Sequence, residues 1–463
     1  MKLPKRPFIR PALISFGLAA VLGAVAWLNR VPQLPHAAPL QPAPAVQSEP
    51  QIPAPVAETT PGSPAVNTAA FKDQGVLAFV WQGLLYTLDG HTGEVKAITE
   101  SGQALYPAWS HDGQWLAFVR VTDPQAQAGP LWIARRDGSQ AHQVQGLPGP
   151  LGRRNFAWSP AADVLAVSTE KGLWLVPAEG GPRRAADQGG TAWSPDGKSL
   201  AYSVVLPFDP NDPESRSDAL YTMAVDGGQP VKRIEAPQAG IILAGWWPDG
   251  KGLLYWVDPL HSNSIAADGL DLFSLRLGDT KPKALTISLV SPQWLSFSPQ
   301  GRLLLVKGGG RIVWAGKSLA VIDVPAGSVQ DLKNPAGSVS LDPSFSPDGR
   351  RIAFVAAKDL GHNVWGFKNP QELAAWVATR TLWIEDADGT KAHPVTSAGG
   401  GVYQPLWSKD GSRLLYVRDN ALWMVEAEGG APARVVDLLP AQKDLFGFYG
   451  FVTFSDQVAW FRN

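Results

Sequence analysis

A short phrase recurs along this chain: an aromatic residue, then Ser, Pro, Asp and Gly, then an apolar run. Residues 193–197 and 345–349 are full copies, and the other copies are degenerate. The copies lie roughly 35 to 62 residues apart, a period typical of solenoids, propellers and arrays. The eight aromatic residues that open the phrase are Trp109, Trp158, Trp193, Trp247, Phe297, Phe345, Trp407 and Phe454.

One repeat unit has the pattern of four short strands. Residues 105–109, 115–119, 131–134 and 141–144 are strand-forming runs, and an Asp-Gly turn at 112–113 separates the first two. Almost no amphipathic helix is evident, which disfavours a parallel α/β fold. Four antiparallel strands per unit, repeated around an axis, predict an all-β propeller. We expect the aromatic residue that ends each first strand to pack between neighbouring blades.

The two ends of the repeat array complement each other. Residues 76–98 hold three runs that resemble second, third and fourth strands without a first one. Residues 450–454 and 457–461 are further strand-forming runs, so the carboxy terminus is expected to complete the amino-terminal blade and close the ring. This predicts eight blades. Seven is the alternative, because the shortest unit, 158–192, could be a distorted blade or an insertion.

The first 70 residues differ from the rest. A basic tail, 1–10, precedes an uncharged run, 11–29, which as a helix would rise about 28 Å and span the hydrocarbon core of a bilayer. Basic residues before such a run predict a single-pass cell-membrane anchor with the rest of the chain outside the cytoplasm. Secretion after cleavage near Ala26 is the alternative. Residues 30–70, rich in Pro and Ala, predict an extended linker before the propeller at 71–463.

Composition and missing motifs narrow the function. The formal net charge is −1, so no basic field argues for nucleic-acid binding. The absence of Cys excludes disulfides, thiol catalysis and zinc–thiolate sites. The sequence has no Gly-x-Ser-x-Gly nucleophile elbow, no His-Glu-x-x-His pattern and no P-loop. Residues 308–310, three glycines between strands, are interpreted as a turn.

The repeat resembles that of the TolB-like propellers, a WD-like family whose repeats also build the propellers of prolyl-oligopeptidase-type enzymes. The resemblance rests on the aromatic-Ser-Pro-Asp-Gly turn, the apolar strand after it, and third strands such as 381–384 that precede an Asp-Gly turn. It covers nearly all of residues 71–463. It implies the architecture strongly and the function weakly, because the family includes binding proteins and peptidase gating domains.

Propeller topology gathers the long insertions on one side. Strands one and two, and strands three and four, have short links on one face, so the links between strands two and three lie on the other. The four long links of this kind are 122–129, 206–218, 258–269 and 358–380. Loops of this length in a compact domain are usually functional or disordered. We call the face that carries them the insertion face, and we expect it to hold the ligand site.

Three segments supply candidate ligand-binding side chains. The acidic loop 206–218 has oxygen ligands that could hold calcium, or it is simply a solvated loop with Asp-Pro turns. Residues 369–372 have the pattern of a helix start, and this helix is expected either to act as a lid or docking element or to pack on its blade. An inter-blade loop ends near the expected channel in two arginines. The candidates are Arg153, Arg154, Asp209, Asn211, Asp212, Glu214, Arg216, His261, His362, Trp365 and Trp376.

We therefore predict a non-enzymatic, membrane-tethered propeller that binds an envelope protein, a peptide or a cell-wall glycan on the insertion face, without a cofactor other than a calcium ion. The alternative is a hydrolase or lyase that acts on a glycan or peptide through carboxylates at the channel mouth. Candidates for these carboxylates are Asp209, Asp212 and Asp342. A purely structural module in a larger envelope complex is a third hypothesis.

Overall fold

In the computed structural model, Gly62–Asn463 form a compact unit. The structure describes this unit, apart from residues 124–125, 153–154, 187–188, 213–214, 397–400, 438–456 and 463. The predicted basic tail, the anchor at 11–29 and most of the predicted linker therefore lie outside the described residues. None of the described helices is long and apolar enough to cross a membrane.

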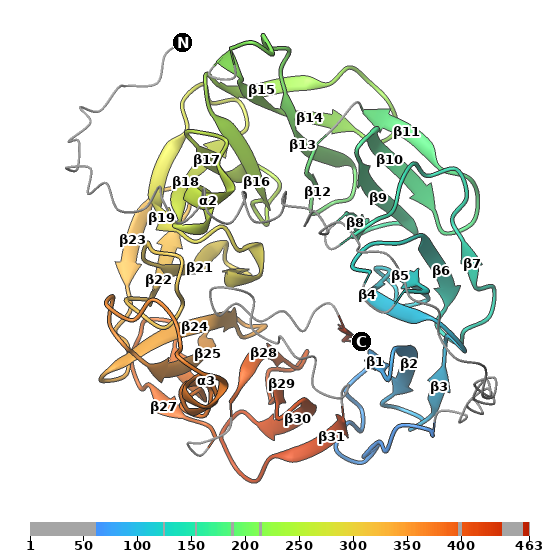
Figure 1. The fold of residues 1–463 in the computed structure, drawn as a ribbon, viewed down its shortest axis with the longest axis vertical. Helices are drawn as coiled ribbons and strands as arrows, with labels where there is room; N and C mark the ends of the chain where they lie inside the picture. Colours follow the sequence, from blue (N-terminus) through green and yellow to red (C-terminus); the bar gives the residue numbers. More distant parts are fainter. Residues whose placement is uncertain are drawn as a thin grey trace, which may run out of the picture. The chain divides into compact units, whose positions relative to one another are not determined.

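The described unit is a succession of antiparallel β-sheets arranged around a ring (Figure 1). The first four sheets have four strands each. The first contains β1 (Val76–Trp81), β2 (Leu84–Asp89), β3 (Val95–Ala97) and β32 (Val458–Phe461). The second contains β4 (Gln103–Trp109), β5 (Trp115–Val121), β6 (Leu131–Arg135) and β7 (His142–Gln143). The third and fourth contain β8 (Phe156–Trp158), β9 (Val164–Thr169), β10 (Gly172–Pro177) and β11 (Arg183–Ala186), then β12 (Thr191–Trp193), β13 (Ser199–Val205), β14 (Asp218–Ala224) and β15 (Val231–Ala236).

An eight-stranded sheet and two four-stranded sheets follow. The larger one contains β16 (Gly240–Trp246), β17 (Gly252–Asp258), β18 (Leu270–Arg276), β19 (Lys283–Ser288), β20 (Leu295–Phe297), β21 (Arg302–Lys307), β22 (Ser318–Asp323) and β23 (Ser328–Asp331). The last two contain β24 (Ser338–Phe345), β25 (Arg351–Lys358), β26 (Thr381–Asp386) and β27 (His393–Pro394), then β28 (Tyr403–Trp407), β29 (Arg413–Arg418), β30 (Ala421–Glu426) and β31 (Ala433–Asp437). The helices are α2 (Asn263–Ala267), α3 (Pro370–Val377) and the 3-10 turn η2 (Pro292–Trp294). The prediction of an all-β chain of four-stranded antiparallel sheets is confirmed.

The Ser and Asp of the recurring phrase close the turn between the first and second strands. In the second sheet, Asp112 Oδ1 accepts hydrogen bonds from the Ser110 hydroxyl at 2.6 Å and from the Gln114 backbone amide at 3.0 Å. The Ser110 hydroxyl oxygen in turn accepts from the Trp115 amide. The same bonds recur at Asp410, where the Ser408 hydroxyl lowers the carboxyl pKa to about 2. The phrase is therefore a turn-forming element.

The aromatic residue of the phrase connects neighbouring sheets. The Trp158 indole N–H donates to the Ala108 carbonyl of the preceding first strand, and Trp407 donates to the Ser344 carbonyl in the same way. In β16 the equivalent bond, to the Ala192 carbonyl, comes from Trp246. Trp247 instead occupies the place of the turn Ser, so our choice of Trp247 as the repeat aromatic was one residue out of register. Phe454 lies outside the described residues.

The last strand joins the first sheet. β32 pairs antiparallel with β1, with Leu77 opposite Trp460 and Ala78 opposite Ala459 (Figure 1). The Trp460 indole N–H donates to the Gln74 carbonyl at 2.5 Å, and its ring lies 6.0 Å from that of Phe71. The sheet that contains β1 is thereby built from residues at both ends of the described unit.

The third strand β26 has a buried carboxyl group, Glu385, at a position where the other third strands have apolar residues. Glu385 on β26 lies opposite Ile352 and is 1% exposed. The residues at the same register in the other sets of four strands are Leu88, Ala134, Val176, Met223, Leu275, Ile322 and Val425, all buried. Neither carboxylate oxygen of Glu385 has a hydrogen-bond partner among the described residues. Burial, with a smaller effect of Asp388, raises its pKa to about 7.

Trp460→Ala is expected to lower the free energy of unfolding by about 3 kcal/mol, because it removes the closing contacts with Gln74 and Phe71. Trp365→Ala is the matched control, since that side chain is 76% exposed, and should change stability by less than about 0.5 kcal/mol. Urea unfolding measures both. Equal effects would show that the closing strand contributes nothing specific.

Glu385→Met is expected to raise stability more at pH 8 than at pH 5, by up to about 3 kcal/mol. The sign follows from the raised pKa: the folded state keeps the proton that the unfolded state loses between about pH 4.5 and 7. Wild-type stability therefore falls as the pH rises through that window. Glu426→Met, on the exposed end of the neighbouring β30, is the control and should show no such pH dependence. A gain that is equal at both pH values would contradict the prediction.

Candidate functional site

The links between second and third strands contact one another along the insertion face. The side chain of Asp218, at the end of the link at 206–218, pairs with that of His261, in the link at 258–269, at 3.3 Å. Asp268, at the end of the link at 258–269, accepts a hydrogen bond from Arg311 at 2.6 Å. Arg311 belongs to residues 308–317 between β21 and β22. Our interpretation of 308–310 as a simple turn was therefore incomplete, because these glycines begin a fifth link.

The fifth link packs against the link at 359–380. Trp314 lies 4.7 Å from Phe367 and 5.9 Å from Trp376, measured between ring centroids. Its indole N–H donates to the Val364 carbonyl. These contacts are local in space but about fifty residues apart in sequence, so turn patterns alone give no signal for them.

Helix α3 begins where its sequence pattern predicts. The Asn369 side chain caps it by accepting from the Glu372 amide at 2.9 Å. Trp376 is 3% exposed and donates to the Lys358 carbonyl, so the helix packs on its own sheet. Packing on the blade was one of the two expectations for this helix.

A buried ion pair connects β24, which carries Asp342, to Arg380 at the end of the link at 359–380. Asp342 Oδ2 accepts from Arg380 Nη2 at 2.7 Å, and both side chains are almost inaccessible. Asp342 Oδ1 accepts from the Trp294 indole at 2.8 Å. The Arg380 guanidinium also donates to the Val402 carbonyl and lies over the Tyr403 ring at 4.2 Å. The charge of Asp342 is thus compensated inside the protein.

Beside this ion pair is a cavity of about 230 Å³. Its lining comes from η2, β20, β24, β28, β29 and β30, with Val458 of the closing strand. Ser338, at the start of β24, pairs with Lys358 at the end of β25, so β24 begins on the insertion face. Asp342 and Gln404 adopt positive φ values of 50° and 45°, and the strand register shifts at both positions. These kinks shape the cavity wall.

The pair of His261 and Asp218 has the geometry of an acid–base dyad. His261 Nε2 lies 3.3 Å from Asp218 Oδ1, while Asp218 Oδ2 accepts from the Ile241 amide at 2.9 Å. The two side chains are 13% and 10% exposed. A carboxylate held by a backbone amide fixes the orientation of the imidazole, as a catalytic base requires.

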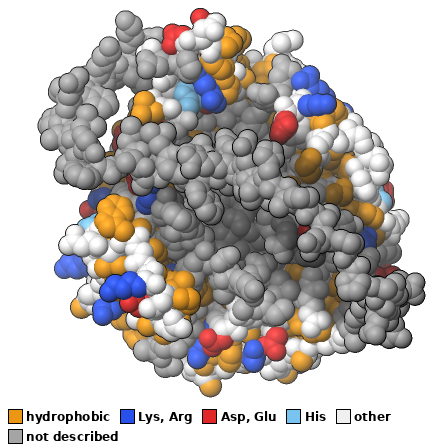
Figure 2. Space-filling view, viewed as in Figure 1, with side chains coloured by type: hydrophobic (Ala, Val, Ile, Leu, Met, Phe, Trp, Pro, Cys, Tyr) orange, Lys and Arg blue, Asp and Glu red, His pale blue; other side chains and the backbone are white. Residues whose placement is uncertain are grey.

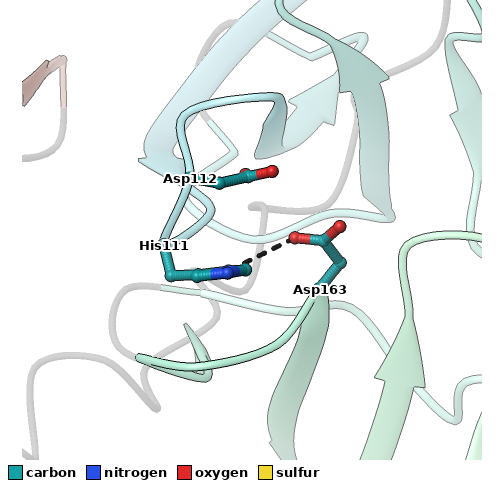
Figure 3. Close-up of side chains that lie close together, drawn as sticks. All are labelled: His111, Asp112 and Asp163. Atoms are coloured by element: carbon teal, nitrogen blue, oxygen red, sulfur yellow. Dashed lines mark ion pairs between the residues drawn. The ribbon is translucent and has the colours of Figure 1, made fainter. Parts of the chain in front are cut away.

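Among the described residues, one group has metal-ligand geometry: His111, Asp112 and Asp163 (Figure 3). His111 Nδ1 lies 3.4 Å from Asp163 Oδ1. Asp112 already closes its turn through Ser110, as its counterparts do in other sheets. The group joins two neighbouring sheets through the ion pair between His111 and Asp163, and Asp163 Oδ1 has no hydrogen-bond partner among the described residues.

The remaining predicted site residues are spread over the insertion links. Asp209 and Asn211 form a local turn in which Asp209 Oδ1 accepts from the Asn211 amide at 2.9 Å. They lie between β13 and β14, whereas Asp342 lies on β24, two sheets further along. The structure therefore does not bring the three candidate carboxylates, Asp209, Asp212 and Asp342, together.

Two other candidates contact or border the link at 308–317. Gly316 packs so closely on the His362 ring that a Cβ there would lie 2.5 Å from Cε1. Trp365 is exposed, and Arg216 is only partly exposed. Arg153, Arg154 and Glu214 lie outside the described residues. The surface in Figure 2 shows Lys and Arg side chains interspersed with Asp and Glu rather than a field of one sign.

Sequence reasoning named Asp218 only as one of the possible oxygen ligands of the acidic loop and did not pair it with His261, and it missed Trp294, Arg380 and Gln404 at the cavity. The available signal was weak. A Pro follows Asp342 and Gln404, and the X-Pro pair marks the kink in each first strand. The pairing of Asp218 with His261 joins two insertions, and the sequence shows that both exist but not that their ends meet.

No family model matches the chain. A curated relative, an uncharacterised peptidase called YuxL from Bacillus subtilis, is 28% identical over 242 residues. The match covers 52% of this chain and 30% of the relative, so the chain spans less than a third of that protein's length. Among solved structures, TolB from Acinetobacter baumannii is 18% identical with a TM-score of 0.35, covering 71% of this chain and 65% of TolB.

The predicted resemblance to TolB-like propellers is confirmed. A prolyl endopeptidase structure is also similar, at 13% identity and a TM-score of 0.45, covering 80% of this chain and 51% of that one. At such identities the likeness concerns the fold alone. That fold is already evident from the sheet topology.

Our prediction of a non-enzymatic binding protein is contradicted. The curated relative is described as a peptidase. This finding favours the alternative that we gave, a hydrolase, over the main prediction. The contradicted prediction rested on missing sequence motifs, and an absent motif excludes only the enzymes that need it.

Arg380→Met is expected to lower the free energy of unfolding by about 3 kcal/mol or more, because it leaves Asp342 buried without its charge partner. The double variant Arg380→Met/Asp342→Asn should recover part of the loss. Arg413→Met, which breaks the exposed pair with Glu426, is the control and should cost less than about 1 kcal/mol. Denaturant unfolding distinguishes these outcomes, and a loss as small as that of the control would refute a structural role for the buried pair.

Proposed function

We propose that this protein is a hydrolase that cleaves peptides and that its described unit is an eight-bladed propeller. The observation that carries the proposed activity is the 28% identity to a peptidase over 242 residues, about half of this chain. That match spans 30% of the relative, so the activity is inferred from part of a longer protein.

The proposed blade number is supported by the strand sets. Six sheets have four strands, and the eight-stranded sheet divides into two sets of four that share one registered pair, Ser288 with Lys307. The unit at 158–192, which suggested seven blades as an alternative, supplies strands to its own sheet, β8 to β11. This supports eight blades over seven.

The proposed acid–base group is His261, oriented by Asp218. Histidine suits this work because an imidazole can both accept and return a proton. The Ile241 amide holds one Asp218 oxygen, which leaves the other directed at the imidazole. Among the described residues, His261 has no hydrogen-bonded serine. The proposed nucleophile is therefore a water molecule that His261 deprotonates as it attacks the peptide carbonyl, with the proton then passed to the leaving amine.

The two carboxylates proposed from sequence on the 206–218 link do not enter this mechanism. Asp209 and Asp212 are exposed and take part in local turns of their link. His261 was one of the predicted ligand-binding residues, and the proposal gives it a specific role. The proposed location stays outside the cytoplasm, supported by the basic tail and uncharged run of the sequence, so the substrates would be extracytoplasmic peptides.

The proposal predicts that full-length protein cleaves members of a fluorogenic peptide library and that His261→Gln lowers kcat by about 100-fold or more. Asp218→Asn should lower kcat by a smaller factor, since it disturbs the orientation of His261. His91→Gln is the matched control, because His91 also pairs with a carboxylate, Asp73, but both side chains are exposed. Its kcat should equal that of the wild type.

Circular dichroism and melting temperature would verify that each variant is folded. Cleavage that survives His261→Gln unchanged would remove the dyad from the mechanism. A wild-type protein that cleaves no peptide in the library would refute the proposed activity itself.

A further inference from the structure

We propose that the cavity beside Asp342 and Arg380 is a subsite that binds one uncharged, apolar side chain of a peptide substrate. This inference rests on the proposed peptidase function and adds to it the class of side chain that is recognised. The cavity lies on β24 and β28, first strands of their sheets, and is distinct from the His261 and Asp218 pair on the insertion face.

The size of the cavity suits a single side chain. Its volume of about 230 Å³ is below the roughly 300–1,000 Å³ of pockets that enclose a whole drug-sized ligand. Ten of its fifteen described lining residues are apolar, among them Leu406, Leu415, Val417 and Leu422, and the other five are Gln293, Ser296, Asp342, Ser344 and Gln404. Such a lining favours aliphatic and aromatic groups, because their transfer from water is worth about 25 cal/mol per Å² of apolar surface.

The electrostatics of the cavity select against a charged side chain. Asp342 is the one charged residue among the described lining residues, and Arg380 and the Trp294 indole already occupy both of its oxygens. A cationic side chain would have to compete with the Arg380 guanidinium at 2.7 Å. An anionic one would lie near Asp342 without a free cation in the described lining. Either charge would lose its hydration without compensation.

The kink at Asp342 in β24 leaves space for the cavity, whereas the similar kink at Tyr106 in β4 is filled by the tyrosine ring. Tyr106, Asp342 and Gln404 all have positive φ and are each followed by Pro. In β4, the Tyr106 ring is buried and its hydroxyl donates to the Gln127 carbonyl. In β24, the shorter Asp342 side chain is drawn back to Arg380 instead. Leu406, on the neighbouring strand, is left 39% exposed on the cavity wall.

The test compares Leu406→Asp with Val329→Asp in the full-length protein. Val329 is a matched control because it is 38% exposed, also on a strand, and not one of the lining residues; its strand, β23, is separated from the lining strand β20 by β21 and β22. Peptide substrates would differ at one position, with Leu, Phe, Lys or Asp. Wild type and Val329→Asp should prefer Leu or Phe over Lys and Asp by about tenfold or more in kcat/KM. Leu406→Asp should lose at least tenfold on the Leu and Phe peptides and gain relative activity on the Lys peptide.

Identical side-chain preference in Leu406→Asp and wild type would overturn the subsite while leaving the proposed activity intact. If no peptide is cleaved, the proposed activity fails, and binding tests the subsite by itself. The Leu and Asp peptides would then be titrated into each protein and their binding measured by calorimetry. The wild type and Val329→Asp should bind the Leu peptide, and Leu406→Asp should not. No binding of the Leu peptide by wild type would overturn the subsite.

Discussion

The pairing of β32 with β1 is the constraint on which the ring depends. Each sheet buries its faces only against its neighbours, so an open array would leave two apolar faces in water. The four residue pairs between Val76–Phe79 and Val458–Phe461 remove those ends. The Trp indoles then repeat one bond from sheet to sheet, such as Trp158 to Ala108 and Trp109 to Ala459. The second of these bonds runs from β4 to the closing strand, so the same contact continues across the junction.

In this ring, the candidate site residues lie on the links and on the first strands of the sheets. The insertion links contact one another through different chemistry at each step: a carboxylate with an imidazole at His261, a carboxylate with a guanidinium at Arg311, and packed indoles at Trp314. The buried pair of Asp342 and Arg380 connects the last link to a first strand. The arrangement of the insertion face is therefore fixed by contacts among the links themselves as well as by the sheets beneath them.

Much of the fold could be predicted because its determinants are local. Ser110 and Asp112 form their turn within five residues, and Asn369 caps its helix three residues on. The site could be predicted only in part. Asp342 and His261 were named, but their partners Arg380 and Asp218 are distant in sequence, and no local pattern pairs them. The prediction of a non-enzymatic protein relied in part on missing motifs, and a pair such as His261 and Asp218, which comes from two separate links, has no sequence motif. The Trp247 error arose because a second tryptophan stands in the place of the turn Ser; the spacing of three residues from the aromatic residue to Asp, as in Trp193 and Asp196, would have selected Trp246.

The pair formed by Ser288 and Lys307 distinguishes one junction of the ring from the others. Elsewhere among the described sheets, adjacent blades are not continuous through the strand ladder, so they can slide slightly by adjusting side chains. Here the backbone itself bridges β19 and β21, and relative sliding would break the ladder. Relative motion between neighbouring sheets is therefore expected at the other junctions of the ring. The two bridged blades would then move together as one stiff segment of the rim.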